Sequence, residues 1–293
     1  MTVAWTVLQV AAPVFLLAAI GFAWVRAGFD YDTTFVTRLA MTLAVPALIL
    51  TALSGTTLEA GTVGRMAVAA LAAYAALLTS LWLLCRVMGL EMRTWLAPLL
   101  FGNSGNLGLP LCLFAFGDAG LALGVVVFAV TAIGQFTFGI WIVAGGGSPL
   151  PALREPMVGA TVLGAVMLWQ GWQLPEVLDN ALTLVGQMAI PLMLITLGVA
   201  VARLSPDRVG TMAGLSVVKA ALGAGLAYAV AVGLGLDRVA AGVLVVQFAT
   251  PVAVSSYLLA LRYGADAQAV AGLVVVSTAL SVAILPVLLS LWL

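Results

Sequence analysis

The chain has 293 residues, of which 64% are apolar and only 8% carry a charged side chain. Soluble domains ordinarily carry about 25% charged residues, so this chain lacks the polar side chains needed to cover a water-exposed surface. Eleven Lys and Arg residues balance eleven Asp and Glu residues, which leaves no basic patch for nucleic acid. The composition predicts an integral membrane protein surrounded by a lipid bilayer.

The residues available for chemistry are few. The chain has no His, and its two Cys residues, Cys85 and Cys112, both lie in apolar stretches. Zinc, haem and His-dependent acyl-transfer sites are therefore excluded, and we expect neither a metal nor a cofactor. Gly102-Asn-Ser104-Gly105 matches the GxSG pattern of rhomboid proteases, but the His base of those enzymes is missing. No carboxylate lies deep in an apolar segment, so aspartyl intramembrane proteases are excluded as well. We expect a protein that is not an enzyme.

Ten apolar segments follow one another along the chain, each near the length of about 20 residues that spans a bilayer. Together they almost exhaust the chain, so no soluble domain fits between them. We number the expected helices 1 to 10; in chain order they are residues 3–25, 34–53, 63–85, 94–117, 119–144, 156–174, 178–201, 209–235, 239–261 and 267–291.

The loops between these segments predict the orientation in the membrane. Helices 5 and 6 are separated by a turn signal at residues 145–151, which is rich in Gly and Pro. Helix 1 has no basic residues before it, so it is not expected to be a cleavable signal peptide. Basic residues favour cytoplasmic loops. Arg65 and Arg238 are the arginines of the even-numbered loops, whereas the odd-numbered loops hold seven: Arg26, Arg86, Arg93, Arg154, Arg203, Arg208 and Arg262. We therefore expect a multi-pass protein of the cell inner membrane with both termini outside.

The two halves of the chain share a pattern. Helix 2 contains Ala44-Val-Pro-Ala-Leu-Ile-Leu-Thr51, and helix 7 contains Ala189-Ile-Pro-Leu-Met-Leu-Ile-Thr196, 145 residues later. Because each half holds five helices, the second half enters the membrane upside down relative to the first. Inverted repeats of this kind are typical of secondary transporters. We expect one repeat over residues 1–147 and an inverted repeat over residues 148–293; the alternative is coincidental similarity in an ordinary polytopic protein.

Helices 4 and 9 are interrupted by residues that disfavour a helix. Helix 4 contains Asn103-Ser-Gly-Asn-Leu-Gly-Leu-Pro110, and helix 9 contains Gln247-Phe-Ala-Thr-Pro-Val-Ala-Val-Ser-Ser-Tyr257. Such stretches survive in a membrane only where protein or a wet cavity satisfies their backbone. If both helices unwind near the midplane, the N-terminus of each second half points at the centre and offers free N–H groups. Two such ends form an anion site without any Arg. The alternative is a pair of kinked packing helices with small-residue contacts.

This interpretation supplies a set of candidate residues. Three of them, Gly108, Pro110 and Pro251, would set the helix breaks. The polar and small residues of the interruptions would bind the substrate: Asn103, Ser104, Gly105, Asn106, Gln247, Thr250, Ser255 and Ser256.

Lys219 is the charged residue in the interior of helix 8. It lies about ten residues from the cytoplasmic end, roughly 15 Å deep, where a buried ion suggests function. It could pair with the substrate, carry a coupling proton or stand in for a bound cation. The alternative is a structural Lys that holds unwound carbonyl groups of helix 4 or helix 9.

These motifs resemble the auxin efflux carrier family, which includes plant auxin carriers and bacterial malonate and malate permeases. The resemblance covers nearly the whole chain. It depends most on Asn103-Ser-Gly-Asn-Leu-Gly-Leu-Pro110, Leu43-Ala-Val-Pro-Ala-Leu-Ile49, Ala189-Ile-Pro-Leu192, Ala249-Thr-Pro251 and Ser255-Ser-Tyr257, together with Lys219.

The resemblance implies an all-α membrane fold of ten helices in two inverted five-helix repeats, similar to bile-acid symporters. Helices 1, 2, 6 and 7 would form a scaffold, and helices 3–5 and 8–10 a transport domain that moves like an elevator. The broken helices 4 and 9 would cross at the substrate, Asn103 would touch its carboxylate, and a homodimer is implied. Two departures stand out: Ser256 replaces a second helix-9 Pro of the auxin carriers, and the loop after helix 5 is short.

The sequence therefore predicts a secondary transporter of a small organic anion, a mono- or dicarboxylate. One alternative is a sodium- or proton-coupled symporter of amphipathic solutes. The other is a membrane receptor or scaffold that transports nothing.

Overall fold

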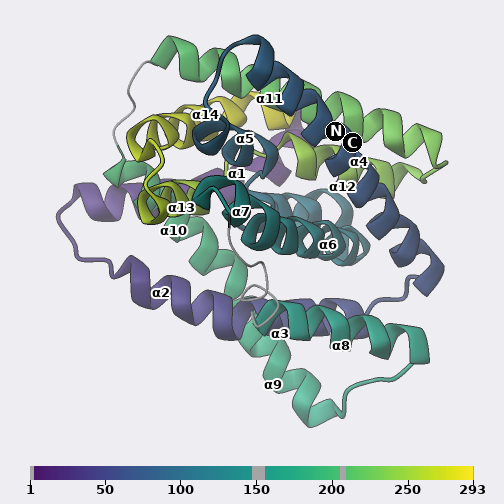
Figure 1. Cartoon of the computed structure of the whole chain (residues 1–293). Helices are drawn as coiled ribbons and strands as arrows, with labels where there is room; N and C mark the ends of the chain where they lie inside the picture. The colour runs from purple at the N-terminus through teal and green to yellow at the C-terminus, as the bar shows by residue number, and fades with distance from the viewer. Residues whose placement is uncertain (1–2, 147–155, 205–208, 293) are drawn as a thin grey trace.

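The computed structural model describes residues 3–146, 156–204 and 209–292. Within them the chain is helical, with no β-strand and one isolated β-bridge (Figure 1). Most of the turn expected at residues 145–151 lies outside the described residues, as do Arg154 and Arg208.

The helical segments follow the expected segments closely in position. In chain order they are α1 (Val3–Arg26), α2 (Thr33–Leu39), η1 (Ala40–Ala44), α3 (Val45–Ser54), α4 (Ala60–Val87), α5 (Met92–Leu100), η2 (Ser104–Gly108), α6 (Leu109–Gly134), η3 (Gln135–Gly139), α7 (Ile140–Ala144), α8 (Pro156–Gln170), α9 (Glu176–Gln187), α10 (Ala189–Arg203), α11 (Val209–Gly233), α12 (Arg238–Ala249), α13 (Val254–Tyr263) and α14 (Ala267–Leu289). The three η segments are single π-helical turns: η1 and η3 lie within longer helical rods, and η2 begins one.

Seven stretches of the described chain are long and apolar enough to cross a membrane: Val7–Arg26, Thr33–Ser54, Ala60–Val87, Ser104–Ala144, Glu176–Arg203, Val209–Gly233 and Ala267–Leu289. Expected helices 4, 6 and 9 are not separate members of this set. Helices 4 and 9 are interrupted between α5 and η2 and between α12 and α13, and the described part of helix 6, α8, has only 15 residues. The structure therefore shows an all-helical membrane protein, and the ten-helix repeat is taken up below as a proposal.

The longest stretch, Ser104–Ala144, turns back on itself at Gly117. Gly117 has φ 65° and ψ −158°, a conformation open to glycine but costly for other residues. A Cβ added at Gly124 would lie 3.2 Å from the Cβ of Cys112. Residues that far apart in a straight helix would be separated by about 18 Å. The segments before and after Gly117 therefore lie side by side.

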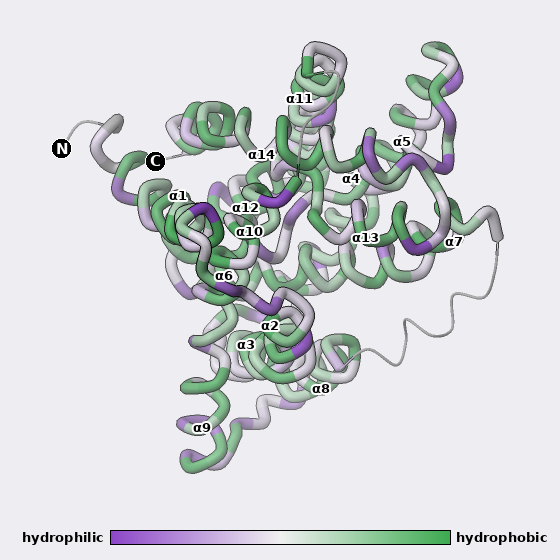
Figure 2. The backbone as a smooth tube through the Cα atoms, turned by 90° about the vertical axis from the view of Figure 1, so that its left-hand side faces the viewer, coloured by the Kyte–Doolittle hydropathy of each residue, from purple (hydrophilic) through white to green (hydrophobic). Residues whose placement is uncertain are grey.

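Two groups of helices make up the molecule. In one group α1 packs along α10, and α3 packs along α8 and α9; in the other, α11 packs against α4, α12 and α14, and α12 packs against α6. Both views place α2, α3, α8 and α9 together below the remaining helices (Figures 1 and 2).

Glycines let the helices of the first group approach closely. A Cβ at Gly198 of α10 would collide with the carbonyl oxygen of Ala18 in α1, and a Cβ at Gly164 of α8 would lie 3.0 Å from the Cβ of Leu53 in α3. Small residues at helix contacts are the usual way for membrane helices to gain packing energy.

Large apolar side chains are exposed on the outer faces of both groups, among them Leu16, Leu71, Val162 and Leu261. Figure 2 shows hydrophobic residues along most of the helices. This surface is suited to a bilayer, in which exposed apolar side chains carry no hydrophobic cost.

Candidate functional site

The two interrupted helices cross at their breaks and share backbone hydrogen bonds. The N–H of Asn103 donates to the carbonyl oxygen of Pro251 at 2.7 Å, and the N–H of Ala253 donates to that of Phe101 at 3.5 Å. Gly102 and Val252 form the antiparallel β-bridge at the centre. Each break thus satisfies backbone groups that the other exposes, which removes most of the cost of unwinding a helix inside a membrane.

The local sequence explains where each helix stops. Thr250 has an extended backbone (φ −55°, ψ 148°), as expected before Pro251, which disfavours a helical conformation in the preceding residue. In the other break, a Cβ on Gly102 would collide with the Thr250 hydroxyl, so only glycine lets the two segments come this close.

The remaining residues expected to set the breaks lie after the first break. Gly108 ends η2, and Pro110 lies in the first turn of α6. Because Pro110 has no N–H to donate, the chain before it takes the wider π-helical turn, in which Leu109 donates to the Ser104 carbonyl. A Cβ on Gly108 would collide with the Gln247 side chain, so Gly108 serves the packing of α6 on α12.

Lys219 stabilises the crossing and does not line the cavity described below. Its Nζ donates to the Thr250 carbonyl oxygen at 2.6 Å, and only 2% of the residue is exposed. A Cβ on Gly102 would lie 3.3 Å from this Nζ. On the same break, the Val252 N–H donates to Ser277 Oγ at 3.1 Å. The carbonyl and N–H freed by the α12–α13 break are therefore held by side chains of α11 and α14.

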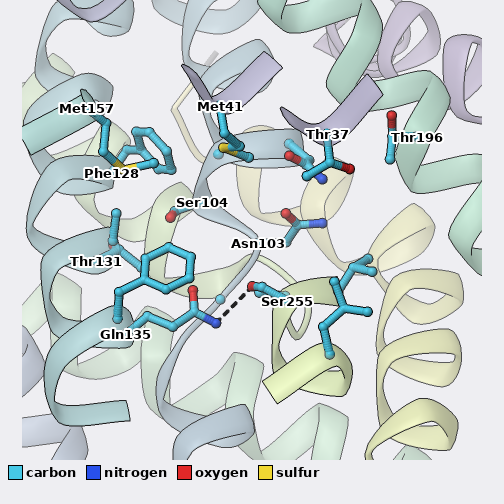
Figure 3. A pocket seen from close by; sticks show the side chains of 18 of the residues that line it. Thr37, Met41, Asn103, Ser104, Phe128, Thr131, Gln135, Met157, Thr196 and Ser255 are labelled. Carbon is cyan, nitrogen blue, oxygen red and sulfur yellow. Dashed lines mark hydrogen bonds between the residues drawn. The ribbon is translucent and has the colours of Figure 1, made fainter. Parts of the chain in front are cut away.

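A cavity of about 110 Å³ opens beside the crossing, between the two groups of helices. In Figure 3 Asn103 lies at its centre, with Thr37 and Thr196 on one side and Gln135 and Ser255 on the other. No lining residue is charged; the lining is Thr33, Thr37, Met41, Gly102, Asn103, Ser104, Gly105, Asn106, Phe128, Thr131, Ala132, Gln135, Phe136, Met157, Thr196, Ala253, Val254, Ser255 and Leu258.

The buried side chain of Asn103 has an unused hydrogen-bond donor. The residue is 5% exposed, and its Nδ2 is buried without a hydrogen-bond partner. It occupies the position before η2 where an Asn side chain ordinarily caps the helix, yet it makes no capping hydrogen bond. An unpartnered buried amide costs about 1–3 kcal/mol, so an arrangement that gives this donor an acceptor would be favoured.

Helix N-termini add further donors on the same side. The rod that begins at Ser104 and the helix α13 that begins at Val254 both start at the cavity wall. The first N–H groups of a helix have no partner within it and carry a partial positive charge. The cavity is therefore lined by neutral donors on a weakly positive background.

The structure brings together five of the eight expected binding residues: Asn103, Ser104, Gly105, Asn106 and Ser255 all line the cavity. The other three do not. Gln247 points toward α6, where its Nε2 lies 3.4 Å from the Gly124 carbonyl oxygen. Thr250 donates its hydroxyl to the Gln247 carbonyl at 2.6 Å, and Ser256 lies buried 3.4 Å from Gln135 Nε2.

Several lining residues were not among those candidates. Gln135 Nε2 donates to Ser255 Oγ at 2.9 Å, the dashed line in Figure 3. Thr33 and Thr37, one helical turn apart, come from α2, and Thr196 comes from α10. The available signal was polar residues at helical spacing in an apolar segment, but Thr in a membrane helix more often bonds its own backbone, as Thr196 also does to the Leu192 carbonyl.

Two continuous helical rods, α2–α3 and α9–α10, border the first cavity. A second cavity, of about 500 Å³, lies toward the other end of these two rods. The first cavity touches the rod from α2 to α3 at residues 33–41, and the second touches it at residues 48–56. Its polar lining is Thr51, Thr56, Asp118, Thr183 and Gln187. Thr51 and Thr196, which occupy matching places 145 residues apart, thus lie in different cavities.

The chain was compared with models of known protein families. Residues 146–289 match the family model described as membrane transport protein. The second half of the chain is thus similar to this family. The match agrees with the resemblance to auxin efflux carriers drawn from the sequence. Together with the apolar helices it supports a multi-pass membrane protein. No curated protein matches the chain.

Proposed function

We propose that this protein is a secondary transporter of a small organic anion, a mono- or dicarboxylate, across the cell inner membrane. The observation that carries the proposal is the unpartnered Nδ2 of Asn103, buried at the wall of an uncharged cavity. Buried polar groups are ordinarily hydrogen-bonded, so an orphaned donor on a residue that lines a cavity supports an acceptor that arrives with the substrate.

The sign of the substrate charge follows from the lining. A cation would need carboxylate or carbonyl oxygens turned into the cavity, and its lining holds no Asp or Glu. Helix N-termini at Ser104 and Val254, with the Asn103 amide, favour an anion. The volume of about 110 Å³ is small beside the about 300–1,000 Å³ of typical ligand pockets, which favours a small acid.

The arrangement of the helices supports elevator-like transport. We assign α1, α2–α3, α8 and α9–α10 to a scaffold and the remaining helices to a transport domain that carries the crossing. The cavity is lined from both groups, by Thr37 and Thr196 on one side and Asn103 on the other. Sliding of the transport domain along the two rods would move the crossing from the Thr196 end to the Thr51 end, where the second cavity already lies.

Packing within this scaffold supports two inverted repeats over residues 1–147 and 148–293. α1 approaches α10 at Gly21 and Gly198, and α8 approaches α3 at Gly164 and Leu53. Gly164 follows Gly21 by 143 residues, and Gly198 follows Leu53 by 145, so one contact is the repeat of the other. We retain from the sequence both termini outside and, by resemblance, a homodimer.

Charge movement in proteoliposomes on solid-supported membranes tests this function. The wild type is offered acetate, malonate, malate and indole-3-acetate, beside Asn103→Ala and Asn103→Asp. We expect a saturable current for at least one acid, absent in both variants; Asn103→Asp keeps the side-chain shape but places a negative charge at the site. Asn180→Ala, which changes an exposed residue of α9, is the matched control and should behave as wild type.

Two outcomes would overturn the proposal. One is an unchanged current in Asn103→Ala. The other is neither a current nor isotope uptake of any of these acids by the wild type, with or without sodium or a proton gradient.

A further inference from the structure

A hydrogen-bonded cluster lies directly behind one wall of the first cavity. Arg203, in the last turn of α10, donates from Nη1 to Thr33 Oγ1 and from Nη2 to the Tyr31 carbonyl oxygen, both at 2.7 Å. Tyr31 Oη lies 2.7 Å from Thr196 Oγ1. Thr33 and Thr196 line the cavity, so one hydrogen bond separates the Arg203 guanidinium from the space that would hold the substrate.

The direction of the Tyr31 hydrogen bond is fixed by its neighbours. Thr196 donates its hydroxyl hydrogen to the Leu192 carbonyl at 2.7 Å, so the Tyr31 hydroxyl donates to Thr196. Partial burial raises the pKa of Tyr31 above its usual value, which keeps this hydroxyl protonated. The Tyr31 hydroxyl therefore fixes the Thr196 side chain, which lines the cavity. The Tyr31 carbonyl fixes the Arg203 guanidinium.

The Arg203 guanidinium has more N–H donors than its two hydrogen bonds use. A guanidinium has five N–H groups and stays charged at any physiological pH; the two bonds above use two of them. In the described part of the chain these bonds go to a hydroxyl and a carbonyl, not to a carboxylate. Asp32, the carboxylate nearest to Tyr31 in sequence on the α2 side, caps α2 by accepting from the Phe35 N–H.

The position of this charge is not explained by the ordinary role of a helix-ending Arg. Such a residue stabilises its helix by reaching the last carbonyl groups of that helix. Arg203 reaches instead across to Thr33, at the start of α2, so its charge is held next to a residue that lines the cavity. The matching place in the other half, 145 residues earlier, is Leu58, so the repeat does not place a cation at the corresponding position beside the second cavity.

We propose that Arg203 selects anions for the transporter, by drawing the substrate carboxylate to the mouth of the first cavity and orienting it toward Asn103. Tyr31 and Thr33 are positioning residues that aim the guanidinium. This inference rests on the proposed function, because it assumes an anionic substrate. It adds an electrostatic determinant of affinity outside the crossing, beyond the Asn103 amide and the helix N-termini of the cavity.

Ionic strength and matched variants test the inference. The Michaelis constant for the acid that gives the largest wild-type current is measured at 20 mM and 500 mM KCl for the wild type, Arg203→Gln and Arg203→Lys. Arg26→Gln is the control, because Arg26 is exposed at the end of α1, five residues before Tyr31, and lines neither cavity. It removes one positive charge at the same end of the scaffold.

We expect Arg203→Gln to raise the Michaelis constant about tenfold at low salt, equivalent to about 1.4 kcal/mol, with the maximal rate within about twofold of wild type. The difference should shrink at high salt, because the screening length falls from about 20 Å at 20 mM salt to about 4 Å at 500 mM, which removes most of an exposed charge's effect. Arg203→Lys, which keeps the charge but not the fork, should lie between wild type and Arg203→Gln. Arg26→Gln should match wild type.

The inference is overturned if Arg203→Gln leaves the Michaelis constant unchanged. It is also overturned if Arg203→Gln and Arg203→Lys are equally impaired without salt dependence, since Arg203 would then only anchor α2. If Arg203→Gln does not fold, a Michaelis constant that is insensitive to salt in both wild type and Arg203→Lys overturns it. These outcomes all require wild-type transport of an acid, so they are distinct from failure of the proposed function.

Discussion

The two cavities sit on the same pair of helical rods but differ in size and lining. The first is small and uncharged, and the crossing of the broken helices forms its wall through Asn103 and Ser255. The second is about 500 Å³, and it is lined by Asp118 at the Gly117 turn and by Thr183 and Gln187 of α9, with no residue of the crossing. The two rods therefore border a cavity at each end. The donors that would bind a substrate belong to the crossing, and they lie at the first cavity.

The matching threonines sharpen this point. Thr196 in the first cavity and Thr51 in the second follow Pro191 and Pro46 at the same spacing. Thr51 bonds only the carbonyl groups of its own helix, Ala47 at 3.0 Å and Leu48 at 3.3 Å, whereas Thr196 also accepts from Tyr31. Equivalent positions thus have different surroundings because the transport helices face one end of the scaffold.

The largest expected effect comes from separating the two breaks. Gly102→Ala places a methyl group against the Thr250 hydroxyl and near Lys219 Nζ, so the crossing has to open. Overpacking of this kind costs about 1–3 kcal/mol, and we expect loss of transport with a lower melting temperature in detergent. Gly225→Ala, in an exposed part of α11 where an added Cβ meets nothing within 4 Å, is the control and should be neutral or slightly stabilising. Normal transport by Gly102→Ala would contradict the crossing as the site.

The position of the breaks could be predicted from sequence for a physical reason. Gly102, Asn103 and Pro251 disfavour a helix through local backbone chemistry, which needs no knowledge of neighbours. The direction of a side chain on the rods that flank a break is different, because it depends on packing. Gln247 lies four residues before Pro251, which ends α12 at the break, yet its side chain faces α6 instead of the cavity.

The scaffold half of the cavity shows the same limit. Thr33, Thr37 and Thr196 belong to apolar helices in which every face is compatible with lipid or with protein. Only the packing of α2 and α10 against the crossing determines which face meets the substrate. Pro110 was expected to mark a break and lies instead within the first turn of α6, because a π-helical turn accommodates its missing donor.

Labelling of single cysteines tests whether the two cavities open to opposite sides. The native Cys85 and Cys112 are buried, so we expect them to react little with the maleimide and the introduced thiol to give most of the labelling. We expect a membrane-impermeant maleimide to reach Thr196→Cys from one side of oriented vesicles and Thr51→Cys from the other. A saturating concentration of the transported acid should protect Thr196→Cys. Reaction of both thiols from the same side would contradict two-sided access.

Removal of single hydroxyl groups gives a smaller effect. Thr196→Val keeps the side-chain volume but leaves the Tyr31 hydroxyl without its acceptor, and a lost hydrogen bond of this type costs about 1 kcal/mol. We expect the Michaelis constant to rise about fivefold. Thr51→Val removes only contacts within α3, so it should change the constant less when substrate is supplied from the Thr196 side. Equal effects from that side would mean that both threonines meet the substrate in one conformation.

The smallest expected effect concerns the charge at the second cavity. Asp118 is exposed, and its carboxylate repels an anion that approaches from that side. One screened exposed charge contributes about 0.5 kcal/mol, so Asp118→Asn should lower the Michaelis constant about twofold when the acid is supplied from the Asp118 side, and leave it unchanged from the Arg203 side. Glu176→Gln is the control, because Glu176 is an exposed carboxylate at the start of α9 that lines neither cavity.

Sided uptake in oriented vesicles measures this difference. A change of the same size from both sides would place the Asp118 effect at the crossing itself. A change from one side alone, opposite in sign to that of Arg203→Gln, would show that the two mouths of the scaffold set the apparent affinity on each face. Because a carrier without a coupling ion cannot set the direction of net flux, a lower Michaelis constant on the Arg203 side must then be matched by a lower maximal rate from that side.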